Sequence, residues 1–166
     1  MQASDEELVA LVVATRDNDA FGELVRRHQG LIRGMMARMS RNTALAEDLA
    51  QDAFIRAFQK IGSFTGKGSF KSWLCSIAYN EFLERFKGDA DESEAPRDMG
   101  SVVDLDRALA TLKEDERTAI VLCFSCGMSH SEAAEATGMP LGTVKSHVNR
   151  GREKLKAYFE SAEAVV

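Results

Sequence analysis

The stretch SHSEAAEATGMPLGTVKSHVNRGREKL, from Ser129 to Leu155, decides the fold of the C-terminal part of this chain. It begins with a spacing of Ser129 and Glu132 that fits a capping box, in which each residue satisfies the other's free backbone N–H. A short alanine-rich helix is expected next, followed by a turn at Gly138, which tolerates a positive φ. Pro140 then favours the start of a second helix. Two helices joined in this way form the helix-turn-helix pattern.

The second helix of this stretch has two faces of different character. Val144, Val148 and Leu155 share one side of the helix and form an apolar stripe suited to a core. The opposite side carries residue types that pair with base edges and phosphates. A polar helix face alone is usually only solvated. Here it occurs together with a small-residue helix, a glycine turn and a basic cluster, which indicates DNA binding. The residues expected to contact DNA are Lys145, Ser146, Asn149 and Arg150.

The net charge of the chain, -5 over 166 residues, is unusual for a DNA-binding protein. Most of the acidity lies in residues 88–101, GDADESEAPRDMGS, which contain five acidic residues and one basic residue. Met99 is the only large apolar residue of this segment, so the segment cannot bury a face. We therefore expect a flexible acidic linker at 88–101, between a domain at 1–87 and a second domain at 102–166.

Helical patterns fill the two remaining parts of the chain. The chain has only two prolines, and its apolar residues recur at intervals of three and four. The predicted fold class is all-α, with two small helical domains, of which the C-terminal one holds the helix-turn-helix. In the first domain we expect helices from about Asp5 to Arg16, after Asn18, after the N-cap Thr43, and from Ser69 to about Lys87. In the second, helices near Val102–Leu112 and Asp115–Cys126 precede the stretch quoted above.

The sequence does not indicate an enzyme, a metal site or a secreted protein. No apolar run approaches the roughly 20 residues that span a bilayer, and the N-terminus lacks the pattern of a secretory signal. Three cysteines are an odd number, so a disulfide framework is not expected, and the default compartment is a reducing cytoplasm. Cys123, Cys126 and His130 could suggest a metal or redox site, but a fourth ligand is missing. We expect no catalytic residue, no metal and no cofactor.

Two long segments resemble the extracytoplasmic-function (ECF) sigma factors, a group of the bacterial sigma-70 family. AEDLAQDAFIRAFQKIGSFTGKGSFKSWLCSIAYNEFLERF, Ala46 to Phe86, is similar to the central conserved region of these proteins. TLKEDERTAIVLCFSCGMSHSEAAEATGMPLGTVKSHVNRGREKL, Thr111 to Leu155, is similar to their fourth region. The resemblance implies a subunit that directs RNA polymerase to promoters and initiates transcription in a stress or environmental response. The implied partners are the polymerase core (its β′ coiled coil and β subunit), promoter DNA and an anti-sigma factor.

The resemblance also assigns roles to individual residues. The helix with the pattern DLxQDxF docks on the polymerase in this family, and its polar residues here are Asp48, Gln51 and Asp52. Their spacing places all three on one side of a helix. The glycine loop and the helix after it bind the minus-ten element as a single strand, which needs aromatic rings, basic groups and pockets for unstacked bases. The matching residues are Phe64, Lys67, Ser69 and Asn80. Trp73 could also stack on a base, but its spacing with Leu74 and Ile77 favours a core position.

The chain departs from the family pattern at a few positions. Glu81 and Glu84 stand where the family is commonly basic, and Tyr79 stands where arginine is frequent, so the phosphate contacts expected there are weakened. Gly151 replaces a frequent alanine, which costs about 1 kcal/mol of helix propensity. Two alternative functions therefore stay open. One is a stand-alone helix-turn-helix regulator that binds DNA as a dimer, and the other is a sigma-like module that binds an anti-sigma factor without starting transcription.

Overall fold

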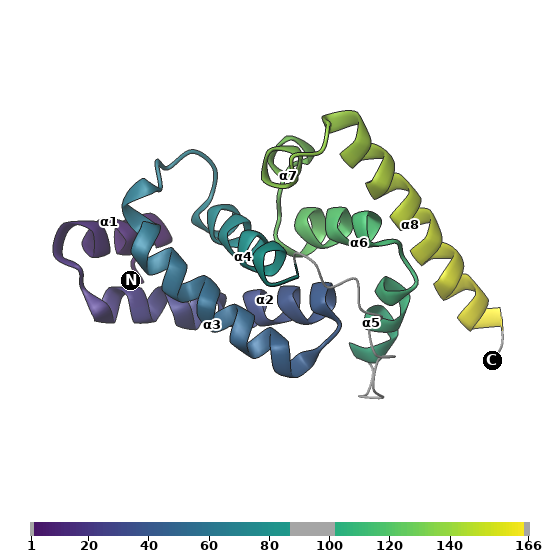
Figure 1. Cartoon of the computed structure of the whole chain (residues 1–166), viewed down its shortest axis with the longest axis horizontal. Coiled ribbons are helices and arrows are strands. Elements are labelled where there is room, and N and C mark those ends of the chain that lie inside the picture. Colours follow the sequence, from purple (N-terminus) through teal and green to yellow (C-terminus); the bar gives the residue numbers. More distant parts are fainter. Residues whose placement is uncertain (1, 87–101, 165–166) are drawn as a thin grey trace.

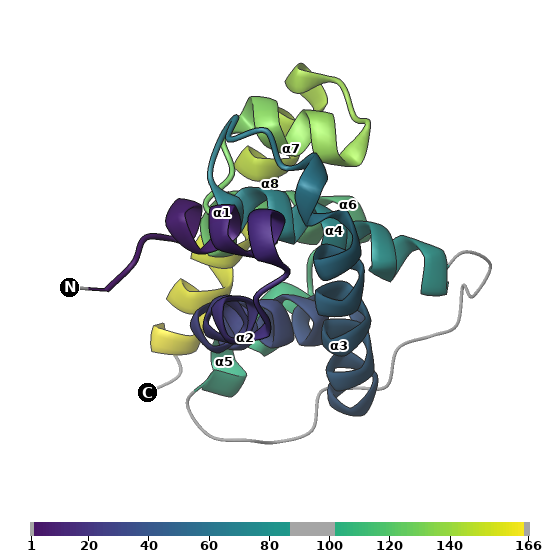
Figure 2. The same cartoon turned by 90° about the vertical axis from the view of Figure 1, so that its left-hand side faces the viewer.

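A computed structural model describes residues 2–86 and 102–164, which form two helical regions (Figures 1 and 2). The predicted all-α class is confirmed, since these residues contain helices and no strand. The acidic segment 88–101 lies outside the described residues, so its role as a linker stays a prediction. The first region contains α1 (Asp5–Thr15), α2 (Asn18–Ser40), α3 (Thr43–Lys60), the 3-10 turn η1 (Ile61–Ser63) and α4 (Phe70–Phe86). The second contains α5 (Val102–Ala110), α6 (Glu114–Ile120), the π-helical turn η2 (Val121–Ser125), α7 (His130–Thr137) and α8 (Leu141–Ala164).

Short polar side chains set the ends of the helices in the first region. Ser4 and Glu7 form a capping box at the start of α1, with N···O distances of 2.9 and 3.1 Å. The prediction that Thr43 caps α3 is wrong by one residue. The side chain of Asn42 accepts the hydrogen bond from the backbone N–H of Leu45 at 3.1 Å, and Thr43 is the first helical residue.

The core of the first region lies between α2, α3 and α4. Large apolar side chains from all three helices are fully buried there, among them Leu24, Ile32, Leu49 and Leu74. Trp73 is partly buried and packs against this core, in line with its predicted position. The core holds α3 and α4 side by side, so their outer faces become the exposed surfaces of this region (Figure 1).

The second region has the predicted helix-turn-helix. Ser129 and Glu132 form both bonds of the capping box, at 3.0 and 3.1 Å. Gly138 ends α7 with a φ of 77°, a left-handed conformation that glycine adopts without strain. The single helix predicted at Asp115–Cys126 is instead α6 continued by a π-helical turn, in which the N–H of Cys126 bonds to the carbonyl of Val121 at 3.1 Å.

Gly151 lies where α8 approaches α6 most closely. A Cβ atom added at Gly151 would lie 2.7 Å from Cγ1 and 3.1 Å from Cδ1 of Ile120. These distances are shorter than carbon–carbon contacts in packed interiors, which are about 3.5–4.0 Å. The glycine that departs from the family pattern therefore permits close packing of the recognition helix, and this packing offsets its low helix propensity.

We expect Gly151→Ala to lower the free energy of unfolding by about 1 kcal/mol, because overpacking exceeds the gain in helix propensity. Urea denaturation followed by circular dichroism measures the change. The same substitution in an Ile120→Ala background should cost less, since the clashing atoms are then absent. A stabilised Gly151→Ala protein would show that the two helices are not in close contact at this point.

The two regions pack directly against each other, which the sequence analysis did not anticipate. Arg38 of α2 donates to Asp106 of α5 at 3.3 Å and to Ser125 of η2 at 3.1 Å. The sulfur atoms of Met35 and Cys126 lie 3.6 Å apart, and α4 contacts α7. The buried apolar side chains of both regions form one continuous core. We call this arrangement the closed arrangement.

Candidate polymerase and nucleic-acid interfaces

The exposed face of α8 carries all four residues predicted to contact duplex DNA. Val144 and Val148 on the opposite face are 0% and 2% exposed, so they fix which side of the helix meets solvent. The hydroxyl of Ser146 donates to the carbonyl of Gly142 at 3.0 Å, so its oxygen keeps the capacity to accept a hydrogen bond. The structure therefore brings donors, an acceptor and two cations together on one helix face. These four exposed residues are Lys145, Ser146, Asn149 and Arg150.

The glycine loop before α4 presents its predicted residues in different ways. Lys67 is exposed between Gly66 and Gly68, whose φ angles are 80° and 78°. Phe64 is half-buried, and its ring centroid lies 5.9 Å from that of Phe70. The loop thus offers one cation, Lys67, and one half-buried ring, Phe64. An apolar cluster holds this loop in place, since no strand or helix contains it.

Two further residues predicted to bind the minus-ten element have different positions. The hydroxyl oxygen of Ser69 accepts from the backbone N–H of Ser72 at 3.0 Å, so Ser69 also caps the start of α4. Asn80 is exposed, but it lies eleven residues along α4 from Ser69, or roughly 16 Å at 1.5 Å per residue. These residues would form a track along α4 and its loop, and the structure does not bring them into a single pocket.

The acidic residues near the end of α4 are paired with a neighbouring helix. Arg56 of α3 lies 3.0 Å from Glu81 and 3.8 Å from Glu84. Their charges are therefore partly neutralised, which reduces the repulsion expected between this surface and a nucleic acid. The acidic residues Glu81 and Glu84 were the main support for a sigma-like module that does not start transcription. Their pairing with Arg56 weakens that support.

The predicted polymerase-docking face of α3 is only partly free. Asp48 and Gln51 are exposed, whereas Asp52 is half-buried and pairs with Arg85 of α4 at 2.7 Å. Ile55 follows Asp48 by two helical turns and is 58% exposed. An exposed apolar residue beside acidic and amide side chains is typical of a protein interface, so its position makes Ile55 a further candidate for docking.

The helix α8 is also held by an ion pair whose carboxylate is buried. The carboxylate of Glu116, whose side chain is 2% exposed, lies 2.7 Å from Nζ of Lys154 and accepts from the backbone N–H of Lys113 at 3.1 Å. Burial opposes ionisation of this carboxyl. The hydrogen bonds from Lys154 and Lys113 outweigh burial, so the pKa of Glu116 lies below its ordinary value of 4.5.

A carboxyl whose pKa is lowered by folding stabilises the protein above its unfolded pKa, and this stabilisation is lost as the pH falls through the folded pKa. We therefore expect Glu116→Gln to lower the free energy of unfolding at pH 7 by roughly 1–2 kcal/mol. The difference from the wild type should shrink below pH 4.5. Urea denaturation across this pH range measures it, and a difference that stays constant with pH would contradict the role of the charge.

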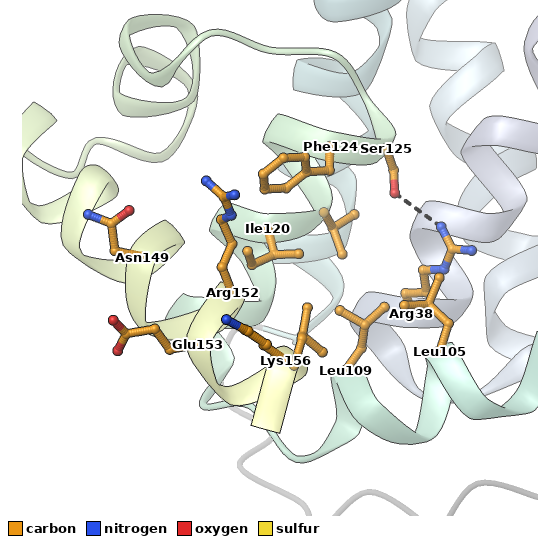
Figure 3. A pocket seen from close by; sticks show the side chains of 12 residues that line it. Arg38, Leu105, Leu109, Ile120, Phe124, Ser125, Asn149, Arg152, Glu153 and Lys156 are labelled. Carbon is orange, nitrogen blue, oxygen red and sulfur yellow. Dashed lines mark hydrogen bonds between the residues drawn. The ribbon is translucent and has the colours of Figure 1, made fainter. Parts of the chain in front are cut away.

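A groove with a volume of about 650 Å³ lies in the second region, between α8 on one side and α5, α6 and η2 on the other (Figure 3). Its floor is apolar and is formed by α5, α6 and η2. Phe124 is 60% exposed at its edge, with the Arg152 guanidinium 5.9 Å from the ring centroid. Arg38 is the one lining residue from the first region, so the first region closes one side of the groove. Asn149 also lines it, so a molecule bound there would cover part of the face predicted to contact DNA.

The described residues show neither a candidate metal site nor a membrane span. In 2–86 and 102–164, no three His, Cys, Asp or Glu side chains are placed to hold a metal ion. No helix in these ranges is long and apolar enough to cross a bilayer. Cys126 is buried and Cys123 is half-buried, and all three cysteines of the chain are free.

Comparison with known proteins gives consistent matches over almost the whole chain. Residues 24–91 match the family model of sigma-70 region 2, and residues 103–155 match that of sigma-70 region 4. The chain is 34% identical to the ECF RNA polymerase sigma factor SigE of Mycolicibacterium smegmatis, over 96% of this chain and 70% of that protein. It is 33% identical to the ECF RNA polymerase sigma factor SigW of Bacillus subtilis, over 84% of this chain and 89% of that protein.

Two solved structures are also similar to this one. CnrH, in complex with the cytosolic domain of CnrY, gives a TM-score of 0.72 at 26% identity, covering 95% of this chain and 97% of that one. The sigma factor RpoE of Bartonella quintana, in complex with the anti-sigma factor NepR, gives a TM-score of 0.72 at 30% identity, covering 84% of this chain and 96% of that one.

Proposed function

The chain belongs to the ECF sigma factors of the sigma-70 family, and from this membership we propose how its residues divide the work of promoter selection. As a sigma factor it directs RNA polymerase to promoters, while the polymerase catalyses RNA synthesis. The domains at 1–87 and 102–166 would bind the minus-ten and minus-thirty-five elements, respectively. The place of action is the cytoplasm, where bacterial polymerase works.

The recognition helix α8 reads the minus-thirty-five duplex. The strongest support is that one face of α8 exposes four side chains able to bind bases or phosphates, Lys145, Ser146, Asn149 and Arg150. The opposite face packs into the core through Val144, Val148 and Gly151. Asn149 and Arg150 have the donors and acceptors that distinguish base pairs in the major groove. Lys145 meets phosphate, which adds affinity without sequence preference.

The glycine loop and α4 hold the opened minus-ten strand. Lys67 lies on the exposed loop and binds phosphate, Phe64 offers a ring edge for stacking, and Asn80 contacts a base farther along α4. Ser69 contributes mainly by fixing the start of α4, since its hydroxyl already caps that helix.

The exposed face of α3 docks on the polymerase core. Asp48 and Gln51 bind cationic side chains of the β′ coiled coil, and Ile55 packs against its apolar positions. Asp52 joins this contact only when Arg85 releases it. Docking also explains the net charge of -5, because an acidic chain with small basic patches binds DNA weakly alone and gains affinity once attached to the polymerase.

The groove of the second region, with Arg38 at its side, fits an inhibitory partner. RpoE and CnrH, which the chain resembles, were solved with NepR and with the cytosolic domain of CnrY, respectively. An anti-sigma factor with an apolar helix flanked by acidic residues would complement the apolar floor and the cations Arg38, Arg152 and Lys156. Such a partner would stabilise the closed arrangement and cover Asn149 at the same time.

A binding experiment separates this function from that of a stand-alone regulator. The free chain should elute as a monomer and scarcely bind a promoter duplex at physiological salt, whereas the complex with core polymerase should bind the same duplex tightly. Light scattering and fluorescence anisotropy measure the two properties. Tight, specific binding by a dimer of the free chain would favour the regulator instead.

A further inference from the structure

The helix-turn-helix packs against the loop proposed to bind the minus-ten strand. In the closed arrangement α7 contacts α4 and lies beside the glycine loop that precedes α4 (Figures 1 and 2). A Cβ atom added at Gly68 of this loop would lie 3.2 Å from Oε2 of Glu132 on α7. A Cβ atom added at Gly127, before α7, would lie 3.5 Å from Nζ of Lys71 on α4. The two regions therefore approach each other closely at two points beside the glycine loop.

The capping box of α7 fixes the orientation of Glu132. Its Oε1 atom accepts from the backbone N–H of Ser129 at 3.1 Å, and its own backbone N–H donates to the hydroxyl of Ser129 at 3.0 Å. Oε2 takes no part in these two bonds and lies against Gly68. A local feature of the helix-turn-helix thus holds a carboxylate oxygen against a segment that is distant in the sequence.

The glycine loop offers this carboxylate an open backbone and a cation. Gly68 has no side chain to keep α7 at a distance, and the exposed Lys67 directly precedes it. A carboxylate and a phosphate present the same kind of anionic oxygen to an ammonium group. Glu132 therefore lies beside the position at which the loop is proposed to bind the DNA backbone.

We propose that Glu132 takes the place of a DNA phosphate at the glycine loop, so that the chain shields this loop while the two regions are closed. The proposal rests on the proposed function of the loop. Only chains whose regions have separated can then bind the minus-ten strand, and the apparent affinity falls by the fraction that is open. This shielding adds a local cause to the weak DNA binding already expected from the net charge of -5.

Two matched variants separate this role from helix capping and from net charge. Glu132→Gln keeps a side-chain oxygen that can accept from the N–H of Ser129, as glutamine does in capping boxes, but it removes the charge. Glu135→Gln removes one charge from the exposed surface of the same helix and leaves the capping box intact. Thermal unfolding followed by circular dichroism checks that both variants are folded.

The first measurement needs no DNA. A brief acetylation of the full chain, read by mass spectrometry of its peptides, compares Lys71 with Lys60, an exposed lysine at the end of α3. We expect Glu132→Gln to raise the labelling of Lys71 relative to Lys60 by roughly two- to fivefold, the range of one exposed ion pair. Glu135→Gln should keep the wild-type ratio. Equal ratios in the wild type and Glu132→Gln would overturn the proposal.

The second measurement uses a short labelled single strand of mixed sequence, since a loop that stacks bases and binds phosphates needs no particular sequence for basal affinity. Fluorescence anisotropy should show an affinity gain of roughly two- to fivefold for Glu132→Gln and little gain for Glu135→Gln. Lys67→Ala should abolish most of the gain. Equal gains for the two glutamine variants would assign the effect to net charge and overturn the proposal.

The remaining outcomes are also decisive. If Lys71 becomes accessible in Glu132→Gln while the affinity stays at the wild-type value and falls with Lys67→Ala, the shielding is wrong. If Lys67→Ala leaves every affinity unchanged, the proposed minus-ten function of the loop fails, and Lys71 labelling alone decides whether Glu132 holds α7 on the loop. If Glu132→Gln folds poorly, a salt series on the wild type replaces it. Screening should then raise the ratio of Lys71 to Lys60 labelling, and a constant ratio would overturn the proposal.

Discussion

Asp48→Lys combined with Gln51→Ala is expected to weaken binding to core RNA polymerase by about 3 kcal/mol or more, a change of at least roughly a hundredfold in Kd. Both residues are exposed on α3 in the free chain, so their loss should not disturb folding. In the docked state each would form a charged or polar hydrogen bond that becomes buried. Reversing the charge also places two cations against each other, which adds repulsion to the lost contacts.

Titration of labelled chain with core polymerase measures this effect, and thermal unfolding checks that the variant is folded. Glu6→Lys is the matched control, because Glu6 is also an exposed acidic residue of a helix. It lies on α1, away from the proposed docking face of α3. The control should bind like the wild type. Equal affinity of the double variant and the wild type would exclude this face of α3 from the interface.

Substitutions on α8 should separate base reading from phosphate binding. Arg150→Ala or Asn149→Ala is expected to cost roughly 1–3 kcal/mol on the preferred promoter and to relax the preference at particular base pairs. Lys145→Ala should weaken binding to all sequences alike and reduce the salt dependence by about one phosphate contact. The difference follows from chemistry, since guanidinium and amide groups fit base edges and an ammonium meets the uniform backbone.

These effects must be measured with the holoenzyme, because the acidic free chain should scarcely bind duplex DNA. Promoter libraries selected at two salt concentrations give both the base preference and the salt slope for each variant. The account of α8 would be contradicted if the Arg150 and Asn149 variants kept the wild-type preference at every base pair.

The helix-turn-helix could be predicted from sequence because its signals are local. The capping box at Ser129, the turn at Gly138 and the apolar stripe of Val144 and Val148 each involve residues within one or two helical turns. Their backbone requirements are properties of the residue types themselves. The face of α8 proposed to read DNA follows from the same spacing, since a buried stripe fixes the opposite side as exposed.

Contacts between distant segments could not be predicted in this way. Ile55 has the spacing of a core residue, yet the buried face of α3 is too narrow to include it, and it is exposed. The sequence did not indicate that the hydroxyl of Ser69, a predicted DNA contact, also accepts a hydrogen bond from the backbone N–H of Ser72. The close approach of Gly151 to Ile120 depends on how α8 crosses α6.

The packing of the two regions is another non-local feature. Arg38 contacts Asp106, and Met35 contacts Cys126, across long stretches of sequence that carry no periodic signal. Such contacts arise from tertiary packing between distant segments, and the residues beside them in the sequence do not indicate them.

Run-off transcription from a promoter library, with core polymerase and this chain, tests the central claim most directly. We expect transcripts that start downstream of a shared pair of minus-thirty-five and minus-ten sequences, and that are lost with the Asp48→Lys, Gln51→Ala variant. The Arg150→Ala variant should select promoters with a relaxed minus-thirty-five element and an unchanged minus-ten element. Core polymerase that binds the chain but yields no promoter-specific transcript would contradict the account.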